Sequence, residues 1–137
     1  MWIIYFNIVS DYEGFTLKIE DQVCSIQVAK CLKELGVKQD SYFHWHKWFS
    51  NRDFELVYDY DRLNNPTENY SAFTVAELGE MLPNYFSTYK YKKGWGACWG
   101  DNMYDIRTFN PLENSKEADA RALIIIYLIE HDLLKIT

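Results

Sequence analysis

The amino-acid sequence predicts an α+β fold, in which a mixed or mainly antiparallel sheet of about five to seven short strands is combined with three helices. Short segments rich in β-branched and aromatic residues alternate apolar and polar positions, as half-buried strands do. Two other segments carry helix-capping residues before an apolar stripe. A third is apolar on almost every side over residues 123–129, so this C-terminal helix is expected to be buried against the sheet.

The N-terminal segment leaves two alternatives open within a chain whose 137 residues fit a single domain, 1–137. Residues 2–9 are rich in Ile, Val and aromatic side chains and predict a strand, and the alternation over residues 15–20 predicts its hairpin partner. Alternatively, residues 1–15 form a variable strand or an extension that is only loosely attached.

The first helix is predicted over Ile26–Leu35, with Ser25 as its N-cap. Gly36 follows where a helix commonly ends in the left-handed conformation, which glycine adopts at the least steric cost. Four apolar side chains recur at helical spacing and are expected to face the core: Val28, Cys31, Leu32 and Leu35.

Residues 42–49 and 54–58 predict two strands, because both segments are dense in aromatic and β-branched side chains. The polar residues 50–53 between them have the composition of a turn, so the two strands are expected to form a hairpin. Residues 59–71 are polar and predict a loop longer than most connections in compact domains.

The second helix is predicted over residues 75–82, because Thr74 and Glu77 have the spacing of a capping box. In that motif the threonine hydroxyl accepts from the backbone of the glutamate, whose side chain reaches back. Pro83 ends the helix, and Gly79 inside it lowers its intrinsic helix propensity.

The remaining chain predicts a three-stranded meander followed by the buried helix. Its strands are expected over residues 85–92, 94–99 and 103–109, where short alternating segments are separated by glycine-containing turns. The last helix is expected to begin after Asn114, with Glu117 three residues later as a second capping signal, and to run to about His131.

Composition and motif content argue against several classes of protein, namely general nucleic-acid binders, disulfide-stabilised domains and membrane-spanning proteins. The net charge of −6 argues against a general nucleic-acid binder, whose affinity comes largely from Lys and Arg on phosphates. The three cysteines, Cys24, Cys31 and Cys98, are expected to be reduced and partly buried thiols. No apolar run reaches the roughly 20 residues of a membrane helix, so a cytoplasmic protein is expected. The common catalytic and nucleotide-binding motifs do not occur, so nothing in the sequence supports an enzyme, although none is excluded, and no cofactor is expected.

His44 and His46 form the first candidate site. Residues two apart on a strand point to the same face, and two adjacent imidazoles are able to bind Zn²⁺ if further ligands converge. The alternative is a pair of half-exposed histidines in an aromatic strand, because no third ligand stands at a recognisable spacing.

A basic and aromatic strand forms the second candidate site, for a small ligand or a nucleotide. Tyr89 and Tyr91 are expected on one face to stack a base, while Lys92, Lys93 and Trp95 follow at the strand end to meet a phosphate. The alternative is an edge strand whose lysines discourage pairing with other chains.

Four tryptophans are candidate anchors for a protein partner, because an aromatic share of 18% is too large for every ring to be expected inside. They are Trp45, Trp48, Trp95 and Trp99. The alternative for Trp95 and Trp99, which stand among glycines, is ordinary core packing or a small-molecule pocket.

Three segments together resemble a group of small uncharacterised proteins encoded by bacteriophages and prophages of gut bacteria. The resemblance spans about residues 20–134 and rests on residues 23–39, 70–83 and 117–122. It implies a setting rather than an activity, namely an accessory protein that acts inside a bacterial cell.

The leading expectation is therefore a non-enzymatic accessory protein that binds a host or phage macromolecule, and countering a host defence is one version of it. A small-ligand or nucleotide-binding protein that uses the aromatic and basic strand is the first alternative. A metal-binding protein that uses His44 and His46 is the second. The sequence leaves the partner and the oligomeric state open.

Overall fold

A computed structural model describes residues 18–58, 67–84, 86–92, 94–100, 106–109 and 116–136. These residues form six strands and three α-helices, which confirms the predicted α+β class. The strands are β1 (Phe43–Lys47), β2 (Glu55–Tyr58), β3 (Glu68–Ser71), β4 (Phe86–Tyr91), β5 (Gly94–Gly100) and β6 (Ile106–Phe109). The helices are α2 (Ile26–Glu34), α3 (Val75–Met81) and α4 (Glu117–Glu130), preceded by the short 3-10 helix η1 (Ile19–Asp21).

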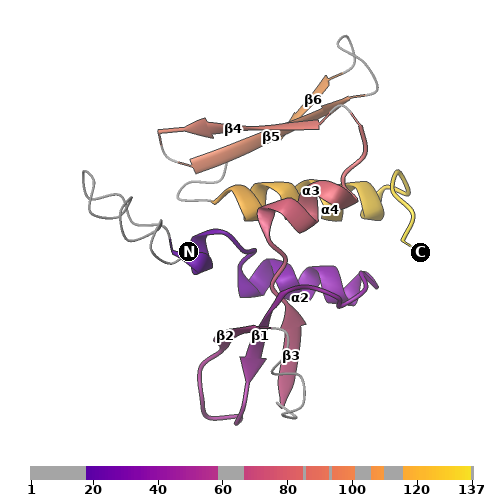
Figure 1. The fold of residues 1–137 in the computed structure, drawn as a ribbon. Coiled ribbons are helices and arrows are strands. Elements are labelled where there is room, and N and C mark those ends of the chain that lie inside the picture. Colours follow the sequence, from indigo (N-terminus) through magenta and orange to yellow (C-terminus); the bar gives the residue numbers. More distant parts are fainter. Residues whose placement is uncertain are drawn as a thin grey trace.

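The strands form two separate antiparallel sheets rather than the single sheet that the sequence predicts. Their orders are β2–β1–β3 and β4–β5–β6. Figure 1 shows the elements in layers, with α4 against the β4–β5–β6 sheet, α3 packed on α4, and α2 between α4 and the β2–β1–β3 sheet. The prediction of one sheet is wrong because helices with apolar surface on more than one side fill the space between the two groups of strands.

The β1–β2 hairpin is confirmed, with Phe43 opposite Tyr58 and His46 opposite Glu55. The predicted loop over residues 59–71 is wrong at its C-terminal end, because β3 occupies Glu68–Ser71 and pairs with β1. This segment lacks an alternating apolar pattern, so only its pairing with a distant strand makes it a strand. Residues 59–66 of the predicted loop lie outside the described part of the chain.

Helix α2 confirms its predicted span but corrects two details. Ser25 has the extended backbone of an N-cap, yet its side chain makes no capping hydrogen bond, and its backbone N–H instead donates to Asp119 at 2.7 Å. The buried residues are Ala29 and Leu32, while Cys31 is exposed. The buried stripe is therefore turned by a fraction of a helical turn from the predicted one.

A short clasp joins the start of the described chain to its middle. Val23 pairs with Thr74, the Cys24 N–H donates to the Phe73 carbonyl at 2.9 Å, and the Val75 N–H donates to the Gln22 carbonyl at 3.0 Å. Residues 19–21 just before the clasp form η1, so the strand predicted over residues 15–20 is wrong in its described part. The strand predicted over residues 2–9 lies outside the described residues.

Helix α3 confirms the predicted capping box. The Glu77 N–H donates to the Thr74 hydroxyl at 3.2 Å, and the Thr74 N–H donates to the Glu77 carboxylate at 3.0 Å. The predicted N-cap of α4 is wrong, because the helix begins at Glu117 after Lys116, which makes no side-chain capping bond. Asn114 lies outside the described residues.

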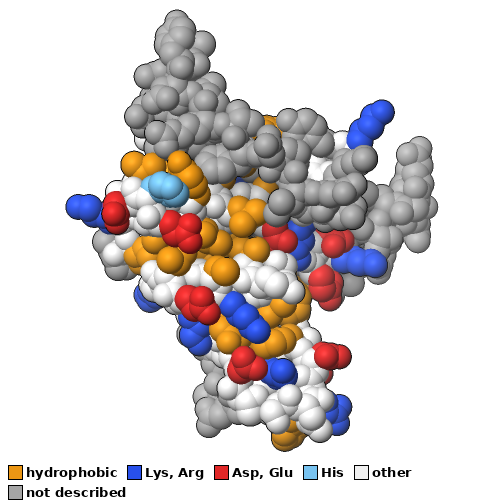
Figure 2. Space-filling model, turned by 180° about the vertical axis from the view of Figure 1, so that it is seen from behind, with side chains coloured by type: hydrophobic (Ala, Val, Ile, Leu, Met, Phe, Trp, Pro, Cys, Tyr) orange, Lys and Arg blue, Asp and Glu red, His pale blue; other side chains and the backbone are white. Residues whose placement is uncertain are grey.

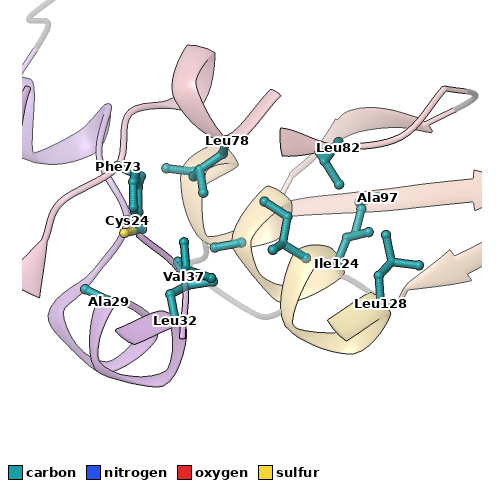
Figure 3. Packing of buried hydrophobic residues seen from close by; sticks show 13 residues of the cluster. Cys24, Ala29, Leu32, Val37, Phe73, Leu78, Leu82, Ala97, Ile124 and Leu128 are labelled. Atoms are coloured by element: carbon teal, nitrogen blue, oxygen red, sulfur yellow. The ribbon is translucent and has the colours of Figure 1, made fainter. Parts of the chain in front are cut away.

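Helix α4 is buried, as its apolar sequence predicts, and it contacts α2, α3 and the β4–β5–β6 sheet. Its side chains Ile124 and Leu128 lie inside a cluster to which the other helices and β5 also contribute (Figure 3). The rest of this core is contributed chiefly by Leu32, Phe73, Leu78, Leu82 and Ala97. Within the described part of the chain, no helix has the length and apolar character needed to cross a membrane.

Candidate functional site

The aromatic and basic strand folds as predicted, as part of the antiparallel meander β4–β5–β6. Tyr89 is half-buried and its ring lies over Gly96 of the neighbouring strand, where any added Cβ would collide with it. Lys92 is exposed in the turn after β4. Lys93 and the side chain of Tyr91 lie outside what the structure describes. Gly96 thus explains how the ring of Tyr89 is held flat on the sheet.

The two tryptophans of β5 are predicted anchors, and their strand has one face on α4. Trp95 is half-buried and stands opposite Lys90 of β4. Ala97, two residues further on the same face, is buried in the core, and its partner Thr88 donates to Glu117 of α4 at 2.7 Å. The backbone of Trp99 belongs to β5, but its side chain lies outside the described part.

His44 and His46 point to the same face of β1, as the sequence predicts, and both are buried with ring centroids 5.8 Å apart. His44 Nε2 donates to the Ser41 carbonyl at 3.1 Å, while Nδ1 lies 3.1 Å from the Asn69 side-chain amide. Both ring nitrogens of His44 are therefore engaged within the protein. The described residues contain no cluster of three or more side chains suited to a metal ion.

Trp45 and Trp48 occupy different environments. The Trp45 indole donates from Nε1 to the Cys24 carbonyl at 2.9 Å and packs against the core. Trp45 thus connects the β2–β1–β3 sheet to the clasp. Trp48 lies beyond the end of β1, where its indole donates to the Glu55 carboxylate at 3.1 Å and its ring edge meets His46.

Aromatic side chains on the β1–β2 hairpin are the exposed residues that sequence reasoning missed. Phe49 at the tip is 62% exposed, Tyr42 just before β1 is 61% exposed, and Tyr58 at the end of β2 is 46% exposed. All three stand at strand ends or beside the turn, and this position is the signal by which the sequence indicates exposure. Figure 2 shows hydrophobic side chains among charged ones at this narrow end of the molecule.

Lysines of α2 lie over two other aromatic rings beside this sheet, those of Phe54 and Tyr70. Lys30 Nζ lies 5.0 Å from the ring centroid of Phe54, and Lys33 Nζ lies 5.0 Å from that of Tyr70. These are cation–π contacts, in which the ammonium group is attracted to the electron-rich face of the ring. Phe54 and Tyr70 thus each have a cationic partner, whereas the rings at the hairpin ends, Tyr42, Phe49 and Tyr58, are the exposed ones.

Comparison of the chain with protein-family models, with curated proteins and with solved structures finds no match. The functional argument therefore depends on the geometry of the described residues.

Proposed function

We propose that the protein is a non-enzymatic binding protein that recognises a macromolecular partner through its β1–β2 hairpin. The observation that carries the proposal is the exposure of Tyr42, Phe49 and Tyr58 on this one hairpin and its flanks. Aromatic side chains are common anchors of protein interfaces, because they bury a large area while losing little side-chain entropy. We name these three residues the hairpin aromatics.

The position of the hairpin supports the same proposal. The β2–β1–β3 sheet forms one end of the layered molecule, and β2 is an edge strand among the described residues (Figure 1). Trp48 adds a half-buried ring beside the tip, held in place by its bond to Glu55. A projecting strand pair that carries exposed rings on an ordered base suits insertion into a groove of a partner.

The cellular setting is proposed from the sequence resemblance alone. A phage or prophage accessory protein would meet its partner inside a bacterial cell, and the partner would be a host or a phage macromolecule. Interference with a host defence protein is the version of this proposal that fits a small protein without catalytic motifs. The acidic net charge of −6 disfavours nucleic acid as a general partner.

The test is affinity capture from bacterial lysates, with and without phage infection, read by mass spectrometry. We expect the wild-type protein to retain one dominant partner through a high-salt wash. The double variant Tyr42→Ser/Phe49→Ser is expected to recover at least about tenfold less of this partner, since each interface anchor of this kind contributes about 2 kcal/mol or more to binding.

The matched control is Ile19→Ser/Leu133→Ser, which removes two exposed apolar side chains away from the hairpin. This control is expected to retain the partner as the wild type does, and circular dichroism checks that both variants are folded. Equal recovery by the two double variants, or no dominant partner in either lysate, would contradict the proposal.

A further inference from the structure

A second site is a pocket of about 390 Å³ that opens between the ends of α2, α3 and α4. Most of its lining is aliphatic, from α3, α4 and the segments after α2 and α4: Val37, Met81, Ile125, Ile129, Leu134 and Ile136. Two lysines and one carboxylate complete it: Lys38, Lys135 and Asp40. This volume lies within the range of small-molecule sites, which are mostly apolar with a few polar groups.

Two matching helix ends build the pocket. Helix α2 is followed by Gly36, whose φ is 90°, and the Val37 N–H donates back to the Leu32 carbonyl at 3.0 Å. Helix α4 ends in the same way at Asp132, whose φ is 55°, and the Leu133 N–H donates to the Leu128 carbonyl at 2.8 Å. Both are Schellman motifs, which reverse the chain and satisfy carbonyls that the helix leaves open.

Each reversed segment then places an apolar residue in the pocket wall and a lysine directly after it. The pairs are Val37–Lys38 after α2 and Leu134–Lys135 after α4. Figure 1 shows the C-terminal segment at the same end of the molecule as the C-terminus of α2. The two pairs therefore approach one pocket from two sides, with aliphatic groups inside and ammonium groups at the rim.

The charge of the rim is positive on balance. Lys38 Nζ lies 3.5 Å from an Asp40 carboxylate oxygen, so this lysine already has a counterion. Lys135 has no ion-pair partner among the residues that the structure describes. An exposed cation beside an apolar pocket complements a ligand whose apolar body ends in an anion.

The residue types of the lining also indicate which apolar ligand the pocket favours. Aromatic residues make up 18% of the chain, yet none of the lining residues is aromatic. A nucleobase or another flat ring would find no side chain to stack on. A flexible alkyl chain needs no such platform, since it gains from the removal of aliphatic surface from water.

We propose that this pocket binds a free medium-chain alkyl carboxylate, with its chain against the aliphatic lining and its carboxylate at Lys135. The alkyl chain replaces water over Ile125, Ile129 and Leu134, and the ammonium group pairs with the headgroup in the exposed rim. This proposal does not depend on the function proposed for the hairpin aromatics.

The experiment is isothermal titration of the full chain with decanoate, octanoate, decanol and decyltrimethylammonium, each below its micelle concentration. We expect decanoate to bind at one site per chain. Octanoate is expected to bind more weakly by about fourfold for each missing methylene group, which is the contribution of one buried methylene. Decyltrimethylammonium is expected to bind most weakly, because its charge has the sign of the rim.

Two charge-reversed variants locate the headgroup. Lys135→Glu is expected to weaken decanoate by about fivefold, the scale of one exposed ion pair turned into a repulsion, and to leave decanol unchanged. Lys92→Glu, at an exposed lysine in the turn after β4, is the matched control and is expected to leave both ligands unchanged.

Three results would overturn the proposal. Heats that grow with concentration and never saturate would show that the alkyl chains adsorb without a site. Equal affinity of decanoate, decanol and decyltrimethylammonium would show that Lys38 and Lys135 only compensate the negative ends of the helices. Equal effects of the Lys135 and Lys92 variants would place the carboxylate elsewhere.

Discussion

The three cysteines show how strongly the surroundings of a side chain determine its chemistry. Cys24 is fully buried in the clasp, Cys31 is exposed on α2, and Cys98 is half-buried with its Sγ 2.9 Å from the Ser87 hydroxyl. Burial raises the pKa of the Cys24 thiol to about 12. The sequence predicts free thiols correctly, but it places Cys31 inside, because the rotation of a helix about its axis is set by its neighbours.

The buried thiol predicts a loss of stability at high pH. Below pH 9, the usual pKa of a free thiol, Cys24 is neutral in both the folded and the unfolded chain. Between pH 9 and about 12 only the unfolded chain releases this proton, so the contribution of Cys24 to the free energy of unfolding falls by about 1.4 kcal/mol per pH unit. Urea titrations of the wild type and of Cys24→Ala measure the effect.

We expect the stability difference between the wild type and Cys24→Ala to be constant below pH 9 and to shift in favour of the variant above it. Cys31→Ala is the control, because that thiol is exposed, and its difference from the wild type is expected to change little over the same range. Parallel curves for the wild type and Cys24→Ala up to pH 11 would contradict the prediction.

At the scale of single elements, a capping residue in the sequence predicts a helix end correctly only where no partner from a distant segment takes over its hydrogen bonds. Thr74 and Glu77 bond to each other, so their spacing is sufficient evidence. Ser25 is a residue type that commonly caps helices, but its side chain makes no capping bond, and its backbone N–H donates to Asp119 instead. Asp132 adopts the left-handed conformation at the end of α4, where the sequence offers no glycine to mark it.

Glu77 is expected to matter more than Thr74, because it also ties α3 to the first sheet. One carboxylate oxygen accepts from the Thr74 N–H, and the other accepts from the Tyr42 N–H at 3.2 Å. Thr74→Ala is expected to lower the free energy of unfolding by about 1 kcal/mol, the usual value of an N-cap. Glu77→Ala is expected to cost about 2 kcal/mol, since it leaves two N–H donors without this partner.

Chemical denaturation of both variants measures these two costs. Glu80→Ala, at an exposed glutamate of the same helix, controls for the change in charge and is expected to cost far less. A Glu77→Ala variant no less stable than Thr74→Ala would show that the bond to Tyr42 contributes nothing.

At the scale of the whole molecule, Arg121 joins its own helix α4 to α3 and β4, which are distant from it in sequence. It donates to the Val75 carbonyl of α3 at 3.0 Å, pairs with Glu117 of α4 at 3.1 Å, and lies over the Phe86 ring of β4. Gly79 makes this possible, because an added Cβ there would collide with the guanidinium. From the sequence, Gly79 only lowers the helix propensity of α3. The side chain that requires a glycine at this position, Arg121, lies on another helix.

A double-mutant cycle tests this account of Gly79. With Arg121 replaced by Met, Gly79→Ala is expected to stabilise the protein by about 1 kcal/mol, the difference in helix propensity between the two residues. With Arg121 present, the same change is expected to be destabilising by about 1 kcal/mol, since the displaced guanidinium loses a charged hydrogen bond. Thermal or urea unfolding of the four proteins gives the coupling, and a coupling near zero would contradict the packing described.

The separation into two sheets has a consequence for the order in which the chain folds. The β4–β5–β6 meander pairs only neighbouring segments, so closing it costs little loop entropy. The β1–β3 pairing and the clasp between Val23 and Thr74 join more distant segments and must close larger loops. We therefore expect the C-terminal meander to form early, and the β1–β3 pairing and the clasp to close last and to open first.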